Sequence, residues 1–349
     1  MRGALQIWRS LMTRAEPAIL LAHGGGGRLA RDLLRGVVLK HFSNTTLDAL
    51  GDAALLQAPT GRLAFTTDSF VVNPLFFPGG DIGKLAACGT INDLAVSGAR
   101  PLALSCALII EEGFPAHDLE VILESMKTVL ESEGVAVVTG DTKVVERGAA
   151  HGLFINTAGI GAVQDPAPAG AHAVRPGDAV LVSGPIGDHG MAVLACREGL
   201  EFQGELRSDC APLYAPARAL LMAAPETRLI RDATRGGLAA ILHEWCEDRD
   251  WGVELDEAAI PVRPETAALC GILGLDPLHA ANEGTFAAVV PADQAQAALQ
   301  ALHSLPATHG AAIIGRIRAD FPGRVVLDTR IRGRRIVDRP AGDPFPRIC

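Results

Sequence analysis

The sequence predicts an α+β fold of two domains, each a mixed sheet covered by helices. Three observations support this prediction. The 349 residues suit two domains of ordinary size. Strand-like and helix-like patterns alternate in both halves of the chain. A stretch rich in proline, alanine and glycine, residues 164–176, separates the halves. We therefore expect domains at 18–168 and 169–338, a disordered N-terminal extension at 1–17 and a flexible tail at 339–349.

In the first half, two segments have the pattern of helices. Residues 81–96 carry small and apolar residues at helical spacing, and Gly98 and Pro101 end the pattern. Residues 116–132 place Leu119, Ile122 and Met126 on one face, as in an amphipathic helix. Apolar runs before, between and after these helices predict strands at 61–68, 101–110, 135–139 and 153–163.

The second half shows the same alternation of strand-like and helix-like patterns. We expect the helices of each half to lie on one side of its sheet. Predicted strands lie at 179–183, 229–232, 251–256, 284–290, 311–318 and 324–329. Predicted helices lie at 189–199, 211–223, 238–247, 264–272 and 292–304. The arginine-rich segment 330–339 is interpreted as a solvated strand edge, with partner docking as the less favoured alternative.

Composition excludes several classes of protein. A net charge of −9 argues against nucleic-acid binding but is compatible with a magnesium–nucleotide site. No uncharged apolar stretch of about 18 residues occurs, so no membrane span is expected. The seven cysteines include no CxxC pair, which excludes a zinc ribbon, and their scattered spacing fits the reducing cytoplasm. Residues 1–17 lack a long apolar region, so an extension or an upstream start is favoured over a transit peptide.

A run of glycines follows the apolar segment 18–22 and His23. Gly24, Gly25, Gly26 and Gly27 would let the backbone approach a bulky anion with its amide groups free to bind phosphate. A flexible turn is the alternative. The run matches neither of the common nucleotide-loop motifs, so it predicts phosphate binding only in combination with other residues.

Four aspartates, Asp52, Asp68, Asp93 and Asp141, lie at the ends of apolar strands or on turns of small residues. Carboxylates and phosphate oxygens are the ligands that Mg²⁺ prefers, so these residues could hold one or two ions on a triphosphate. An aspartate at a strand end is more commonly a turn or cap residue. Asp93 differs, because it lies within a helical pattern.

Two further motifs surround predicted strands of the second half. Asp232 and Thr234 precede a helix start, where free amide groups favour anions, although either could be an ordinary N-cap. Glu283 lies between Asn282 and Gly284 just before an apolar strand, a pattern that alone indicates a turn.

The last ten residues, 340–349, contain three prolines and end at Cys349. Prolines keep such a segment extended, and the 11 residues from Arg339 to Cys349 could reach about 36 Å. A prenylation box is excluded because no residues follow the cysteine. The segment therefore predicts a mobile arm that carries a thiol into a site, with a frayed tail as the alternative.

Together these motifs resemble the HypE family of hydrogenase maturation factors, within the PurM-like (aminoimidazole ribonucleotide synthetase) superfamily. The resemblance covers about residues 19–349. The superfamily motifs are GDAA at 51–54, TTDSF at 66–70, NDLAVSGARP at 92–101, GDTKVVERG at 140–148 and DATRGG at 232–237. The ending PRIC at 346–349 is the feature that narrows the resemblance to this family.

The resemblance implies a PurM-like fold whose N-terminal domains pair in a homodimer, and an ATP-dependent carbamoyl dehydratase. A carbamoyltransferase, HypF, would place a carbamoyl group on Cys349. The enzyme would then use ATP and Mg²⁺ to dehydrate the thiocarboxamide to a thiocyanate. The cyanide would pass through a HypC–HypD complex to the iron of a [NiFe]-hydrogenase.

The resemblance also implies roles for the residues named above. Asp52, Asp68, Asp93 and Asp141 would hold magnesium and phosphates, the glycine run would close over them, and Asp232 and Thr234 would contact the nucleotide. Lys143 and Glu283 would steer charge and accept protons near the thiocarboxamide. The alternatives are a selenophosphate synthetase, a thiamine-phosphate kinase and a non-catalytic thiol carrier. The first should have a reactive cysteine or selenocysteine before its glycines, where this chain has His23.

Overall fold

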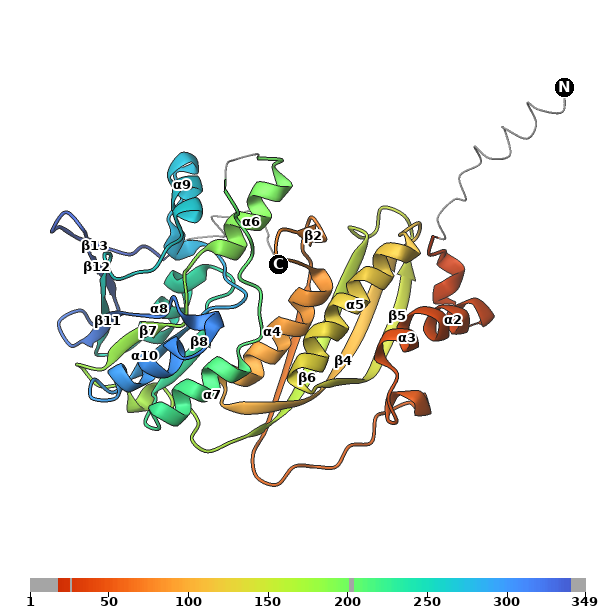
Figure 1. Ribbon diagram of the computed structural model, residues 1–349, viewed down its shortest axis with the longest axis horizontal. Helices are drawn as coiled ribbons and strands as arrows, with labels where there is room; N and C mark the ends of the chain where they lie inside the picture. Colours follow the sequence, from red (N-terminus) through yellow and green to blue (C-terminus); the bar gives the residue numbers. More distant parts are fainter. Residues whose placement is uncertain (1–17, 26, 201–203, 340–349) are drawn as a thin grey trace.

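The computed structural model describes residues 18–25, 27–200 and 204–339. They form two large sheets that lie at opposite ends of an elongated molecule, with helix α4 (Ile82–Val96) between them (Figure 1). The first sheet has the strand order β1–β6–β4–β5 and the second the order β13–β12–β9–β11–β7–β10–β8. Residues 164–178, between β6 and β7, connect the sheets. Within the described residues, no helix is long and apolar enough to cross a membrane.

The first sheet is mixed, because β4 pairs parallel to β5 and antiparallel to β6, while β1 pairs antiparallel to β6. Its strands are β1 (Leu63–Phe70), β4 (Ala99–Glu111), β5 (Ala136–Val145) and β6 (Leu153–Val163), and a small hairpin joins β2 (Phe76–Phe77) to β3 (Gly80–Asp81). The prediction for β5 was too short. The strand continues through the GDTK motif, so Asp141 lies inside a strand instead of after one.

One face of this sheet is covered by α4 and α5 (Ala116–Glu133) (Figure 1). The two helices approach closely at Gly83, where a Cβ would lie 2.1 Å from the carbonyl oxygen of Ile122. The apolar face predicted for α5 is confirmed, since Leu119 and Met126 are fully buried. These contacts form the core of the first domain.

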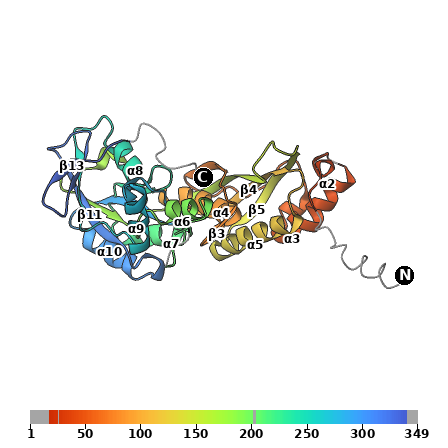
Figure 2. The same ribbon diagram turned by 90° about the horizontal axis from the view of Figure 1, so that it is seen from above.

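A helical run that the sequence pattern did not predict lies at the edge of this layer. It consists of the short η1 (Leu21–Gly24), α2 (Arg28–Leu33), a π-helical turn η2 (Leu34–Val38) and α3 (Leu39–Phe42). The run packs beside α5 and lies at the far end of the molecule from the second sheet (Figure 2). The turn η3 (Leu47–Ala49) follows it.

The other face of the first sheet carries exposed apolar side chains. Along β1, residues alternate between the helix-covered face and this open face. Leu63 is 54 % exposed, Phe65 is 69 % exposed, and Ile109 of β4 is 39 % exposed. A sheet face with such side chains is typical of a surface that a partner covers.

The second sheet consists of β7 (Ala179–Val182), β8 (Leu229–Asp232), β9 (Gly252–Asp256), β10 (Phe286–Val290), β11 (Ala312–Arg318), β12 (Val325–Asp328) and β13 (Arg334–Ile336). Strands β12 and β9 pair in parallel, and the other neighbouring strands described in this sheet pair antiparallel. Strands β7 and β10 are buried at every position, which fits a sheet covered on both faces.

Helices do cover both faces, so the expectation of helices on one side is wrong for this half. Helix α8 (Gly237–Cys246) packs with Val180 and Val289 on one face. On the other face, α7 (Tyr214–Ala223) and α10 (Ala295–His303) pack with Leu181 and Phe286. The remaining helices are α6 (Asp188–Arg197) and α9 (Pro264–Leu273), with 3-10 turns η4 (Ala171–Ala173), η5 (Pro277–His279) and η6 (Pro306–Thr308).

Helix α4 contacts both sheets. It packs on β1, β6 and α5 of the first domain and on α7 and β8 of the second. Thirteen of its 15 residues are buried, and a helix buried on all sides has no solvent face. This placement sets the polar residues near its C-terminal end, Asn92 and Asp93, at the boundary between the domains.

Candidate active site between the two domains

A cluster of acidic side chains lies where the two domains meet. Asp68 comes from β1, Asp93 from α4 and Asp232 from the end of β8. Asp68 shares a hydrogen bond with Asp93, whose Oδ2 also accepts a bond of 2.6 Å from Thr66 Oγ1. Contacts between α4 and both β1 and β8 bring the three elements together. Residues separated by 164 positions thus form one acidic cluster.

Burial and repulsion between carboxyls raise the pKa values of Asp68 and Asp232. Burial raises the pKa of Asp68 to about 6, with a further contribution from Asp93, while Arg235 acts in the opposite direction. Burial raises the pKa of Asp232 to about 7, and repulsion from Asp93 adds to it. Carboxyls that repel one another in a buried site favour binding of a cation.

The structure rejects the alternative of ordinary caps for Asp232 and Thr234. Helix α8 begins at Gly237, and its N-cap is Gly236, in the left-handed conformation with φ 75°. A Cβ at Gly237 would lie 2.5 Å from the carbonyl oxygen of Ala280, so only glycine fits there. The Asp232 carboxyl is therefore available to the acidic cluster, and Thr234 is partly buried in the adjoining turn.

Glu283 lies beside this cluster and is 3 % exposed. Burial raises its pKa well above the ordinary value, with further contributions from Cys210, Asp232, Asp209 and Asp68. A carboxyl whose pKa is raised by burial is a stronger base once ionised, as general-base catalysis requires. The structure thus brings Glu283 together with Asp68, Asp93 and Asp232, although the sequence alone indicated only a turn.

Sequence reasoning missed two residues that hold the Glu283 segment. Asp209 accepts hydrogen bonds of 3.0 Å from the backbone N–H groups of both Glu283 and Gly284. Burial raises the pKa of Asp209 to about 6. From the opposite domain, Asn92 donates from Nδ2 to the Glu283 carbonyl oxygen at 3.1 Å. Both contacts join residues far apart in sequence, so no local sequence pattern could have predicted them.

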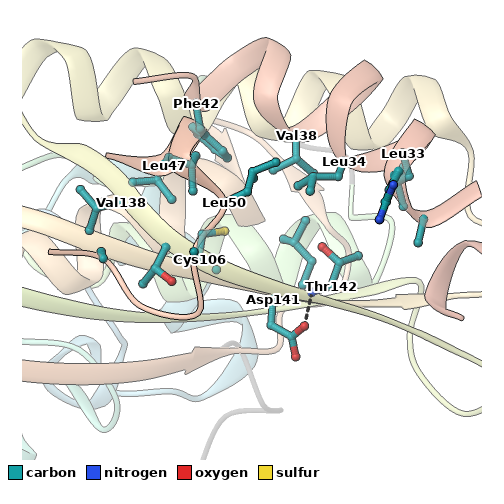
Figure 3. A pocket seen from close by; sticks show the side chains of 18 of the residues that line it. Leu33, Leu34, Val38, Phe42, Leu47, Leu50, Cys106, Val138, Asp141 and Thr142 are labelled. Carbon is teal, nitrogen blue, oxygen red and sulfur yellow. Dashed lines mark hydrogen bonds between the residues drawn. The ribbon is translucent and has the colours of Figure 1, made fainter. Parts of the chain in front are cut away.

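A second group of predicted residues lies at the far edge of the first sheet. A pocket of about 410 Å³ opens between β5 and the α2–α3 run, lined by His23, Gly24, Asp141 and Lys143 among others. Its wall is largely apolar, with Leu34, Val38, Phe42, Leu47 and Leu50 gathered on one side (Figure 3).

At the edge of this pocket, the Asp141 side chain is turned away from the apolar wall and accepts a hydrogen bond from the Thr142 backbone (Figure 3). Lys143 Nζ lies 3.6 Å from Asp141 Oδ2, and both side chains are about two-thirds exposed, at 65 % and 64 %. Gly24 packs tightly against β5, since a Cβ there would lie 2.8 Å from the Val144 nitrogen.

The four predicted aspartates do not form one cluster within a single chain, which corrects the expectation. Asp68 pairs with Thr157 of β6, which in turn pairs with Cys106 of β4. Asp141 pairs with Ala107, the residue after Cys106, so it is offset from Asp68 by one residue along the sheet. Asp68 and Asp141 therefore face opposite sides of the sheet, on its two outer strands, about 14 Å apart at the usual strand spacing. Asp52 is exposed in the segment before β1.

Among the residues that the structure describes, no group of three or more His, Cys, Asp or Glu side chains is arranged to hold a metal ion. Gly25 is the C-cap of η1, and Gly27 is the N-cap of α2. Gly26 and Cys349 lie outside the described residues.

Comparison with known proteins identifies the family to which this two-domain fold belongs. Two family models match, the C-terminal domain of AIR synthase related proteins over residues 175–328 and the N-terminal domain over residues 50–163. The carbamoyl dehydratase HypE of Rhizobium leguminosarum bv. viciae is 48% identical over 350 residues, with full coverage of both chains. The chain belongs to the HypE family of carbamoyl dehydratases. The Escherichia coli K12 member is 47% identical and covers 95% of this chain and 99% of its own.

Solved structures of HypE proteins agree with the fold. HypE in complex with ATP superposes with a TM-score of 0.90 at 44% identity, covering 95% of this chain and 99% of its own. A HypE–HypF complex gives 0.77 at 45% identity, covering 88% of this chain and 99% of its own. The thiamine monophosphate kinase of Aquifex aeolicus, at 18% identity, TM-score 0.57 and coverage of 86% and 98%, shares the fold alone. The predicted PurM-like two-domain fold and the family are confirmed.

Proposed function

We propose that this carbamoyl dehydratase converts a thiocarboxamide on Cys349 to a thiocyanate with ATP, and that the acidic cluster between the domains is where this happens. The main observation that supports this proposal is the position of Glu283, a buried carboxyl beside the Asp68–Asp93–Asp232 cluster. One site thus combines groups suited to hold a metal–triphosphate with a base suited to remove a proton.

The reaction proceeds in two steps. The amide oxygen attacks the γ-phosphorus of ATP, the bond to the ADP oxygen breaks, and one N–H proton leaves. The second N–H proton then leaves, its electron pair completes the carbon–nitrogen triple bond, and the C–O bond breaks with phosphate as leaving group. The balance is thiocarboxamide plus ATP to thiocyanate, ADP and phosphate, with one net proton released near neutral pH.

The two protons need an acceptor close to the amide nitrogen. Glu283 serves this role, because burial raises the pKa of its carboxyl and so makes its carboxylate a stronger base. Lys143 is exposed and carries the positive charge that would steer phosphate oxygens. Asp232 and Thr234 contact the nucleotide, and the glycines 24–27 close over its phosphates.

The acidic cluster fits a magnesium ion. Mg²⁺ is usually bound by one or two carboxylates together with substrate phosphates, so a complete protein cage is not needed. Asp68 and Asp93 face each other, and burial with repulsion raises the pKa of Asp68, which a cation would reverse. When bound, the ion would neutralise charge on the transferring phosphoryl group.

We propose that the enzyme is a homodimer formed through the open face of the first sheet. That face exposes Leu63, Phe65 and Ile109. Asp141 and Lys143 lie on it too, on the opposite side of the sheet from Asp68. A dimer through this face lets Asp141 and Lys143 of one chain complete the site that holds Asp68 and Glu283 of the other.

Mixed dimers test this arrangement. Asp68→Ala and Asp141→Ala homodimers should each be inactive. If the site is shared, random mixing of the two variants restores about one quarter of wild-type activity, because half of the dimers are mixed and each has one intact site. If each chain uses its own residues, mixing restores nothing, and the shared site is refuted.

For the partners, we propose that a HypF-type carbamoyltransferase loads Cys349 and that a HypC–HypD complex receives the cyanide. The solved HypE–HypF complex of a relative supports the first of these. The cytoplasmic location stays a prediction.

Mass spectrometry of the peptide that carries Cys349 tests the chemistry. After incubation with the carbamoyltransferase, carbamoyl phosphate and ATP, the wild-type peptide should gain a carbamoyl group and then lose one water. Glu283→Gln and Lys143→Ala should gain the group but convert it about 10²–10⁴-fold more slowly. Conversion at the wild-type rate in both variants would remove them from the mechanism.

A further inference from the structure

We infer that Asn92 is a positioning residue for the dehydration, holding Glu283 in place from across the domain boundary. The inference rests on the proposed function, because it takes Glu283 as the base. Nothing in the reaction requires Asn92 itself to touch the substrate, and its role follows from its contacts alone.

The Asn92 side chain lies in the first domain, and its partners among the described residues belong to the second. Its Nδ2 donates to the carbonyl oxygens of Ala211 and Glu283, each at 3.1 Å, and its Oδ1 accepts from the Leu213 N–H at 2.7 Å. The residue is 1 % exposed. An amide has two donors and an acceptor on one rigid group, and no other side chain of this size can satisfy all three partners.

These bonds fix the peptide of Glu283 on its carbonyl side. On its N–H side, Asp209 accepts from Glu283 and Gly284. Gly284 also packs tightly, since a Cβ there would lie 1.9 Å from the Asp209 carbonyl oxygen. The backbone that carries the base is therefore held between two side chains, one from each domain.

Asn92 also precedes Asp93 in α4, and the two adjacent residues face different parts of the site. Asp93 contacts Asp68 and Thr66 in the first domain, while Asn92 reaches the segment that carries Glu283. One rigid helix thus fixes the distance between the proposed phosphate-binding carboxyls and the base. A displacement of about 1 Å in such a geometry can cost about 10²-fold in rate.

The test uses full-length enzyme loaded on Cys349 and mixed with Mg-ATP in a single turnover. Asn92→Ala should slow dehydration about 10–100-fold, while the KM for Mg-ATP and the loading of Cys349 stay within about 2-fold of wild type. Asn92→Asp keeps the side-chain volume and the bond from Leu213 but loses both donors, so it should show the same loss if Asn92→Ala does not fold.

The decisive measurement is a double-mutant cycle with Glu283→Gln. If Asn92 acts through Glu283, adding Asn92→Ala to Glu283→Gln slows the reaction by less than about 2-fold. Multiplicative losses would overturn the inference while leaving the proposed base intact. A wild-type rate for Glu283→Gln alone would instead overturn the proposed function.

A control variant separates positioning from general loosening of the domain boundary. Tyr214→Phe is the matched control, because it removes the 2.9 Å bond from Tyr214 Oη to Gln164 Oε1 without touching Glu283. It should leave the rate within about 2-fold, and an equal loss in this control would also contradict the inference.

Discussion

Replacement of Asp232 by asparagine should stabilise the ligand-free protein, and the gain should depend on pH. Asp232 is buried at the end of β8, and burial together with Asp93 raises its pKa from 3.8 to about 7. The folded state therefore binds a proton that the unfolded state has released between these two pH values. The free energy of unfolding contributed by this group falls as pH rises through that window, because ionisation inside the cluster is unfavourable.

The size of the effect follows from the pKa change. A pKa of about 7 in place of 3.8 corresponds to about 4 kcal/mol at pH 7 and above, and asparagine removes that penalty. Since asparagine is itself a buried polar side chain, we expect a net gain of about 2–4 kcal/mol. The difference between variant and wild type should be constant below about pH 4, grow by about 1.4 kcal/mol per pH unit up to about pH 7, and then level off.

Urea unfolding of both proteins between pH 4 and 8, without Mg²⁺ or nucleotide, measures this difference directly. The control is Thr227→Val, which removes the buried 2.7 Å bond from Thr227 Oγ1 to the Ala224 carbonyl oxygen but no charge. Its effect should be independent of pH. Parallel curves for Asp232→Asn and wild type across the whole range would refute the electrostatic reasoning for the cluster.

Three further outcomes are expected. Cys349→Ala should keep Mg-ATP affinity in calorimetry but show no carbamoylation by mass spectrometry; carbamoylation of another cysteine would contradict the assignment. Phe65→Asp should convert a dimer of about 73 kDa to a monomer of 36.4 kDa in light scattering, and an unchanged mass would exclude the open face as the interface. Gly83→Ala should destabilise by about 1–3 kcal/mol in urea unfolding, because its Cβ would meet the Ile122 carbonyl oxygen. A stability within about 0.5 kcal/mol of wild type would show that α4 and α5 can separate locally.

The elements that local pattern defines were predictable. Helix α5 was expected at 116–132 and lies at Ala116–Glu133, because its apolar residues recur on one face. Strand β6 was predicted with its observed bounds, Leu153–Val163. By contrast, the helical run from Arg28 to Phe42 was missed, since Gly36 and a π-helical turn interrupt its periodicity.

The site was predictable in its residues but not in its arrangement. Asp93 was predicted as a site residue because a carboxylate inside a helical pattern is not explained as a turn residue. The structure places it against Asp68. The roles of Asn92 and Asp209 depend on contacts over 191 and 74 positions of sequence, which periodicity cannot report. The separation of Asp141 from Asp68 follows from strand order and pleat, which the sequence leaves open.

The burial of α4 between the two sheets has a consequence for how the protein unfolds. Helix α4 supplies packing to both hydrophobic cores, so neither domain can lose its structure without exposing part of the other's interior. The two domains are separated in the sequence, but they should unfold together as one cooperative unit. Denaturation should follow a single transition, and the amides of α4 should be among the slowest to exchange with solvent deuterium, opening only when the whole chain does.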